Sequence, residues 1–203
     1  MKRVLLLLCD GVEILEAAAF HDVLGWSGVY GSEAVEVVTA SPGPTLRCTF
    51  GLRVTPDMAL AEVFPESFDA LAIPGGFEDF GFYREAYSES VLDLIRRFEA
   101  AGKPIASICV GALPLGRSGI LKGRKATTYG LLDGRRRIQL SAFGAEVLDE
   151  PLVVDGDVAT SRSPAEAVAS ALWLLGRLTG EANARRIAGL MGFGPHGEEP
   201  ERA

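Results

Sequence analysis

Residues 105–118 read IASICVGALPLGRS, and the fold and the chemistry can both be argued outward from this stretch. Its first four residues are small or apolar, as in a short strand buried on both faces. A helical pattern follows from residue 110. Cys109 lies at the junction, between Ser107 and Gly111. This is the spacing of a nucleophile elbow, a tight strand-to-helix turn that holds a side chain at the strand tip.

The position of Cys109 at the start of a helix predicts a reactive thiol. The first amides of a helix point toward such a side chain, and the helix dipole favours the thiolate. The alternative is a core cysteine, because free cysteine is among the most buried residue types.

Strand-length apolar segments alternate with helical patterns on both sides of this stretch. We expect strands at residues 4–9, 34–40, 68–73, 105–108 and 124–128, extended segments at 46–54, 147–154 and 158–160, and helices at 13–26, 85–101, 110–118, 131–143, 163–178 and 180–191. Asp155-Gly156 predicts a hairpin turn, and Ser163-Pro164 a helix start with a serine cap. Such alternation predicts an α/β fold, with a mostly parallel sheet, helices on both faces and a ligand site at the carboxyl ends of the strands.

Length and composition restrict the class of protein. The 203 residues suit a single domain at 1–191 with a polar tail at 192–203, and a hydrophobic fraction of 48% supports a sizeable core. The net charge of -7 argues against nucleic acid and anionic membranes as partners. The apolar run at residues 4–8 is predicted to be a buried strand rather than a signal peptide, and no stretch is long enough to span a bilayer.

The three cysteines, Cys9, Cys48 and Cys109, are too few and too scattered for a disulfide framework. No cysteine or histidine spacing matches a zinc site, so we expect no metal. Free thiols in a reducing compartment predict a cytoplasmic location.

Two further segments could complete a site around Cys109. Glu16 follows the first predicted strand, where its carboxyl could exchange a proton with the thiol; Glu13 lies one helical turn earlier. Each could instead lie on a solvated helix face. In Pro74-Gly75-Gly76, glycines at a strand end would let backbone amides approach an oxyanion, although any tight loop would also use them.

The histidine content argues against a cysteine–histidine protease. Only His21 and His196 are present. His21 lies about 140° around the helix from Glu16, so the two side chains should not face the same thiol. His196 falls in the polar tail.

These segments resemble the ThiJ/PfpI superfamily, also called the DJ-one group. The matching stretches are 2–16 (KRVLLLLCDGVEILE), 54–60 (VTPDMAL), 68–76 (FDALAIPGG), 105–112 (IASICVGA), 119–128 (GILKGRKATT) and 153–164 (VVDGDVATSRSP). The resemblance implies a flavodoxin-like three-layer sandwich, usually a homodimer, that acts on a small molecule without a cofactor. It implies that Cys109 is the reactive cysteine, that Glu16 rather than Glu13 is its partner, and that the amides of Gly75, Gly76 and Val110 form the anion pocket.

Several positions differ from individual branches of this superfamily. Val110 stands where the protease branch has histidine, and Tyr129 stands where the deglycase branch often has one. Trp26 and Phe50 fall where some members have arginines at an anion site. The isonitrile hydratase branch is similar at residues 108–116 and 119–128, but its acid is an aspartate in a differently composed loop.

The resemblance therefore implies a cysteine-dependent enzyme with glyoxalase- or deglycase-like chemistry on 2-oxoaldehydes. An isonitrile hydratase-like lyase and a non-catalytic redox sensor that uses Cys109 oxidation are the alternatives. We expect Tyr129, Phe77 and Trp26 as possible walls of the pocket.

Overall fold

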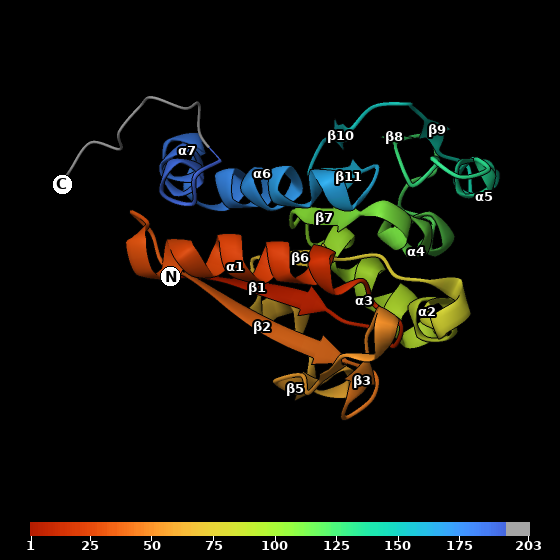
Figure 1. The fold of residues 1–203 in the computed structure, drawn as a ribbon, viewed down its shortest axis with the longest axis horizontal. Helices are drawn as coiled ribbons and strands as arrows, with labels where there is room; N and C mark the ends of the chain where they lie inside the picture. The colour runs from red at the N-terminus through yellow and green to blue at the C-terminus, as the bar shows by residue number, and fades with distance from the viewer. Residues whose placement is uncertain (194–203) are drawn as a thin grey trace.

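A computed structural model describes residues 1–193. Its centre is a seven-stranded sheet in the order β10-β11-β7-β6-β1-β2-β5 (Figure 1). The strands are β1 (Lys2–Leu7), β2 (Val35–Ser41), β5 (Met58–Ala59), β6 (Ala70–Ile73), β7 (Ile105–Ile108), β10 (Leu152–Asp155) and β11 (Val158–Ser161). All neighbours pair in parallel except β10, which pairs antiparallel with β11 at one edge. The predicted mostly parallel sheet is confirmed.

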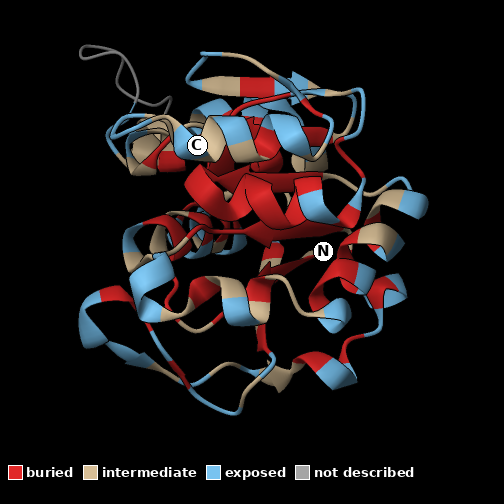
Figure 2. Cartoon of the chain, turned by 90° about the vertical axis from the view of Figure 1, so that its right-hand side faces the viewer, coloured by how far each residue is buried: buried red, intermediate tan, exposed pale blue. Residues whose placement is uncertain are grey.

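Helices cover both faces of this sheet, as predicted. They are α1 (Ile14–Tyr30), α2 (Phe82–Ala86), α3 (Glu89–Ala100), α4 (Ala112–Ser118), α5 (Arg135–Ala142), α6 (Ala167–Thr179) and α7 (Glu181–Leu190). Helices α1, α6 and α7 pack against one another on one face, while α3 packs on β6 and against α4 on the other (Figure 1). Buried residues concentrate in the sheet and on the inner sides of the helices (Figure 2).

Two small sheets lie outside the central one. Strands β3 (Leu46–Arg47) and β4 (Arg53–Val54) form a hairpin within the segment 46–54 that was expected to be extended, and β8 (Lys125–Ala126) pairs in parallel with β9 (Glu146–Val147). The β10–β11 hairpin at Asp155-Gly156 confirms the turn predicted there.

Several predicted element boundaries were wrong. The helix predicted at 85–101 is two helices, because the chain leaves the helical conformation at Ser88. The helix predicted to start at 131 starts at Arg135, since Gly134 has a left-handed φ of 71°. Ser163 precedes a single 3₁₀ turn before α6; its hydroxyl donates to the Glu166 carboxylate (2.6 Å) and makes no capping bond to the backbone.

No helix within residues 1–193 is long and apolar enough to cross a membrane. Of the tail predicted at 192–203, residues 194–203 lie outside the described residues.

Candidate active site

Cys109 occupies the tight turn that its spacing predicts. It follows β7 directly and opens a 3₁₀ turn, Cys109–Gly111, that leads into α4. Its φ of 56° is left-handed, a conformation that costs a residue with a side chain about 1–2 kcal/mol. The Thr128 hydroxyl donates to the Cys109 carbonyl (2.8 Å) and so helps to hold the turn. Gly111 is required because a Cβ there would meet the Ile73 carbonyl oxygen at 2.6 Å.

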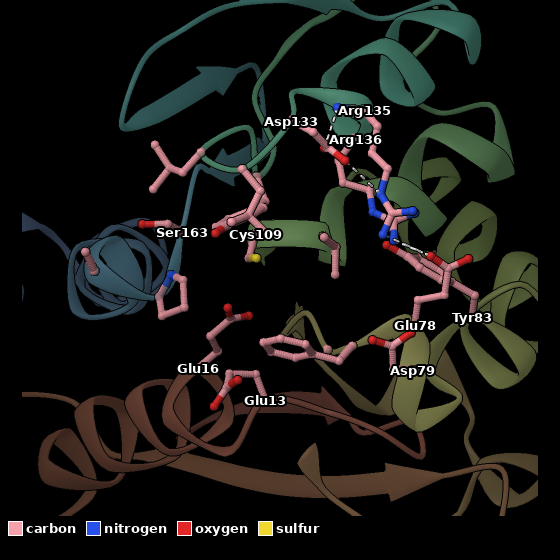
Figure 3. A pocket seen from close by; sticks show the side chains of 18 residues that line it. Glu13, Glu16, Glu78, Asp79, Tyr83, Cys109, Asp133, Arg135, Arg136 and Ser163 are labelled. Atoms are coloured by element: carbon pink, nitrogen blue, oxygen red, sulfur yellow. Dashed lines mark hydrogen bonds and ion pairs between the residues drawn. The ribbon is translucent and has the colours of Figure 1, made fainter. Parts of the chain in front are cut away.

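Glu16 lies in the first turn of α1 and is fully buried. The Gly75 N–H donates to its Oε2 at 2.6 Å. Its Oε1 is buried and makes no hydrogen bond within residues 1–193. The carboxyl group and the Cys109 sulfur face each other (Figure 3). The carboxyl is therefore fixed by one oxygen and directed at the thiol.

Burial raises the pKa of Glu16 from 4.5 to about 8, although the hydrogen bond from Gly75 and the neighbouring Cys109 thiol lower it. A carboxyl out of contact with water strongly disfavours its charged form. Glu16 therefore carries a proton over much of the neutral range.

The pKa of the Cys109 thiol is raised well above its usual value. Burial is the main cause and the charge of Glu16 is the second, while the Val110 N–H lowers the pKa. The helix-start amide thus acts in the predicted direction, but it is outweighed by burial and, when Glu16 is ionised, by the charge of that carboxylate as well. Two groups so close titrate as a pair, so a thiolate at Cys109 requires the proton to stay on Glu16.

A cavity of about 530 Å³ opens above this pair (Figure 3). Among the predicted site residues, it is lined by Cys109, Glu16, Gly76, Val110, Phe77 and Tyr129. The structure therefore places six of the eight predicted residues on one cavity, and a seventh, Gly75, binds the Glu16 carboxyl beside it.

Trp26 does not line this cavity. It lies ten residues beyond Glu16 on α1, which is about 15 Å along a helix axis. Its ring packs on Tyr30, with centroids 5.3 Å apart, and is partly exposed. The prediction that Trp26 forms a wall of the pocket was wrong.

The three predicted anion-binding amides differ in their availability. The Gly75 N–H already donates to Glu16. Gly76 lines the cavity and forms an isolated antiparallel bridge with Val12. The two hydrogen bonds of this bridge are donated by the N–H groups of Glu13 and Phe77, so the Gly76 N–H has no acceptor within residues 1–193. The Val110 N–H lies close to the Cys109 sulfur and lowers the pKa of the thiol. Gly76 and Val110 are therefore the amides that a ligand could use.

The outer wall includes charged residues that the sequence did not single out. Arg136 donates to the Glu78 carboxylate (2.6 Å) and lies over the Tyr83 ring, 4.9 Å from its centroid. Arg135 lies 3.3 Å from the same carboxylate. Arg135 and Arg136 lie more than fifty positions along the chain from Glu78 and Tyr83, so no local sequence pattern links them. The run of arginines at 135–137 was the only signal available.

Comparison with known proteins gives a consistent assignment. The family model described as "DJ-1/PfpI family" matches residues 2–176. The protein dj-1beta of Drosophila melanogaster is 31% identical over 187 residues, which cover 92% of this chain and 95% of the relative. Its crystal structure superposes with a TM-score of 0.82, covering 94% of this chain and 97% of that one, at 30% identity. Deglycase TK1284 of Thermococcus kodakarensis is 34% identical over 166 residues, which cover 81% of this chain and 92% of the relative.

Proposed function

This chain belongs to the DJ-1/PfpI family, and we propose that it is a cysteine-dependent enzyme with glyoxalase- or deglycase-like chemistry on small electrophiles such as 2-oxoaldehydes. The observation that carries this proposal is the pairing of a strained Cys109 with a buried Glu16 carboxyl that faces its sulfur, both of them lining an open cavity. The relatives named as deglycases support the same chemistry.

The reactive form in this proposal is the pair that has lost one proton. With the remaining proton on Glu16, the Cys109 thiolate adds to the aldehyde carbon of a 2-oxoaldehyde and forms a carbon–sulfur bond. The carbonyl electron pair moves to oxygen, where the Gly76 N–H stabilises it. Glu16 then gives its proton to this oxygen, which leaves a hemithioacetal and a Glu16 carboxylate.

The second half of the cycle uses Glu16 as a base. Its carboxylate removes the hydrogen on the former aldehyde carbon and returns a proton to the neighbouring carbon, while the hydroxyl proton moves to the former ketone oxygen. The product is a thioester of a 2-hydroxy acid. Water, deprotonated by Glu16, attacks this thioester and displaces the Cys109 thiolate. The sum is one 2-oxoaldehyde plus one water giving one 2-hydroxy acid, with no external oxidant or reductant.

The test is turnover of methylglyoxal to lactate, followed by liquid chromatography. We expect Cys109→Ser to abolish turnover, because serine is a far weaker nucleophile at neutral pH. Cys48→Ala is the matched control, since Cys48 is also a buried free cysteine but does not line the cavity. Equal turnover by the wild type and Cys109→Ser would refute the proposal.

We also propose that the chain forms a homodimer through α1. This helix buries Phe20 and Leu24 against the rest of the domain but leaves large apolar side chains exposed to solvent. A helix that is apolar on nearly all sides is stable in water only when other protein surfaces pack against each of those sides. Its exposed apolar residues include Leu15, Trp26, Val29 and Tyr30.

A single domain over residues 1–191 and a cytoplasmic location remain proposals that rest on the sequence. The free thiols of Cys9, Cys48 and Cys109 are compatible with a reducing compartment.

A further inference from the structure

The cavity above Cys109 is larger than the smallest 2-oxoaldehyde requires. Its volume of about 530 Å³ falls in the range of about 300–1,000 Å³ that is typical of sites for whole drug-sized ligands. Methylglyoxal has only five non-hydrogen atoms. The unfilled space must therefore accommodate a further group on the substrate or stay hydrated.

Exposed apolar side chains surround the mouth of this cavity. Leu131 and Leu132, in the loop before α5, are 60% and 85% exposed, and Phe77, just after β6, is 43% exposed. All three line the cavity. Large apolar side chains gathered at the mouth of a concave site mark a binding surface, because a bound apolar group would remove them from water.

The Phe77 side of the mouth is reinforced by a strained residue. Phe50 has a φ of 66° and, with Cys109, is one of two non-glycine residues with positive φ in residues 1–193. A bulky residue in this conformation is a backbone outlier. Its exposed ring lies 5.9 Å from Phe77 and 5.8 Å from Phe80, between centroids, so it extends the apolar wall outward.

The charged residues at the mouth do not favour an anionic substrate. They are Glu13, Glu78, Asp79, Asp133, Arg135 and Arg136. Both arginines already face carboxylates, Arg136 at 2.6 Å from Glu78 and Arg135 at 3.6 Å from Asp133. Carboxylates outnumber guanidinium groups, so the mouth carries net negative charge and repels anions.

Building on the proposed function, we propose that the electrophile taken by Cys109 carries a bulky apolar group and no negative charge. Leu131, Leu132 and Phe77 determine this specificity. The reactive carbonyl reaches Cys109 while the apolar group fills the outer part of the cavity between the two leucines and the phenylalanine.

The experiment compares kcat/KM for three 2-oxoaldehydes. Isobutylglyoxal carries a branched apolar group, 4,5-dioxopentanoate has nearly the same size but ends in a carboxylate, and methylglyoxal is the small reference. We expect kcat/KM for isobutylglyoxal to exceed kcat/KM for each of the other two compounds by roughly ten-fold or more. A few additional apolar contacts contribute about this much to discrimination between substrates. Leu132→Ser should reduce this preference several-fold. Leu52→Ser, at an exposed leucine outside the cavity, should leave it unchanged.

The outcomes separate this inference from the function on which it rests. Cys109-dependent turnover at similar kcat/KM for all three compounds would overturn the specificity and leave the function standing. An unchanged preference in both Leu132→Ser and Phe77→Ala would also overturn it. If none of the three compounds is turned over, the proposed function fails, and the specificity fails with it.

Discussion

Glu16 lies in an environment quite different from that of an ordinary carboxyl on the protein surface. It is fully buried, receives one hydrogen bond from the Gly75 N–H and directs its second oxygen at a thiol. Such a position is costly for a charge but suits a group that alternately donates and accepts a proton. In the proposed mechanism neither Glu16 nor Cys109 acts alone, because each depends on the other for the location of the shared proton.

Replacing Glu16 by glutamine should make the protein more stable at high pH. The carboxyl keeps its proton up to about pH 8 in the folded chain and loses it near 4.5 when unfolded, so the wild type loses stability as pH rises between these values. The loss is about 1.4 kcal/mol per pH unit, or up to about 3 kcal/mol at pH 7. Glu16→Gln should therefore gain in free energy of unfolding relative to the wild type from pH 4.5 to 8, measured by urea denaturation.

Glu13→Gln provides the matched control, since Glu13 lies one turn earlier and is only partly buried. It should show a much smaller gain over the same pH range. If the wild type and Glu16→Gln keep a constant stability difference across this range, Glu16 is not held neutral by burial.

The loop after β6 positions the pair through its backbone. A Cβ on Gly75 would lie 3.0 Å from both the Glu16 Oε2 and the Val110 nitrogen. Because these atoms belong to α1 and to the turn before α4, the absence of a side chain at Gly75 lets three segments meet. The proline-glycine-glycine sequence predicted such a close approach but not that the first glycine binds the carboxyl instead of the substrate.

Gly75→Ala should therefore displace Glu16 and reduce methylglyoxal turnover by at least about ten-fold, the usual consequence of a misplaced catalytic group. Gly189→Ala, inside α7 where a Cβ meets nothing within 4 Å, should leave turnover unchanged and stabilise the helix by about 0.5–1 kcal/mol. Steady-state kinetics and thermal unfolding of both variants would check this. Full activity in Gly75→Ala would show that the close approach of Gly75 to Glu16 is not needed for turnover.

The assembled fold leaves one apolar helix partly uncovered. If α1 is the dimer interface, the 21.6 kDa chain should sediment at twice its mass at micromolar concentration. Trp26→Glu should shift it toward the monomer, because a buried unpaired charge is costly at an interface. Sedimentation velocity would decide this, with Phe64→Glu as a control at an exposed aromatic outside α1. A wild-type monomer at all accessible concentrations would exclude the dimer.

Much of this arrangement could be predicted because it is encoded locally. The buried strand before Cys109, the small residues around it and the helix after it lie within fourteen consecutive positions. Contacts between distant residues could not be predicted in the same way. The approach of Arg136 to Glu78 depends on where the loop before α5 crosses the cavity, and Trp26 was misplaced because helix length carries it away from Glu16.

The rate of Cys109 alkylation by iodoacetamide, followed against pH by peptide mass spectrometry in the wild type and in Glu16→Gln, tests most directly whether the two residues share one proton. In the wild type the rate should rise with pH and level off near pH 8, where Glu16 loses its proton and its charge then opposes ionisation of the thiol. In Glu16→Gln the rate should keep rising above pH 8 and exceed that of the wild type, because no carboxylate then forms beside the thiol to raise its pKa. Superimposable pH profiles for the two proteins would show that Glu16 does not control the thiol.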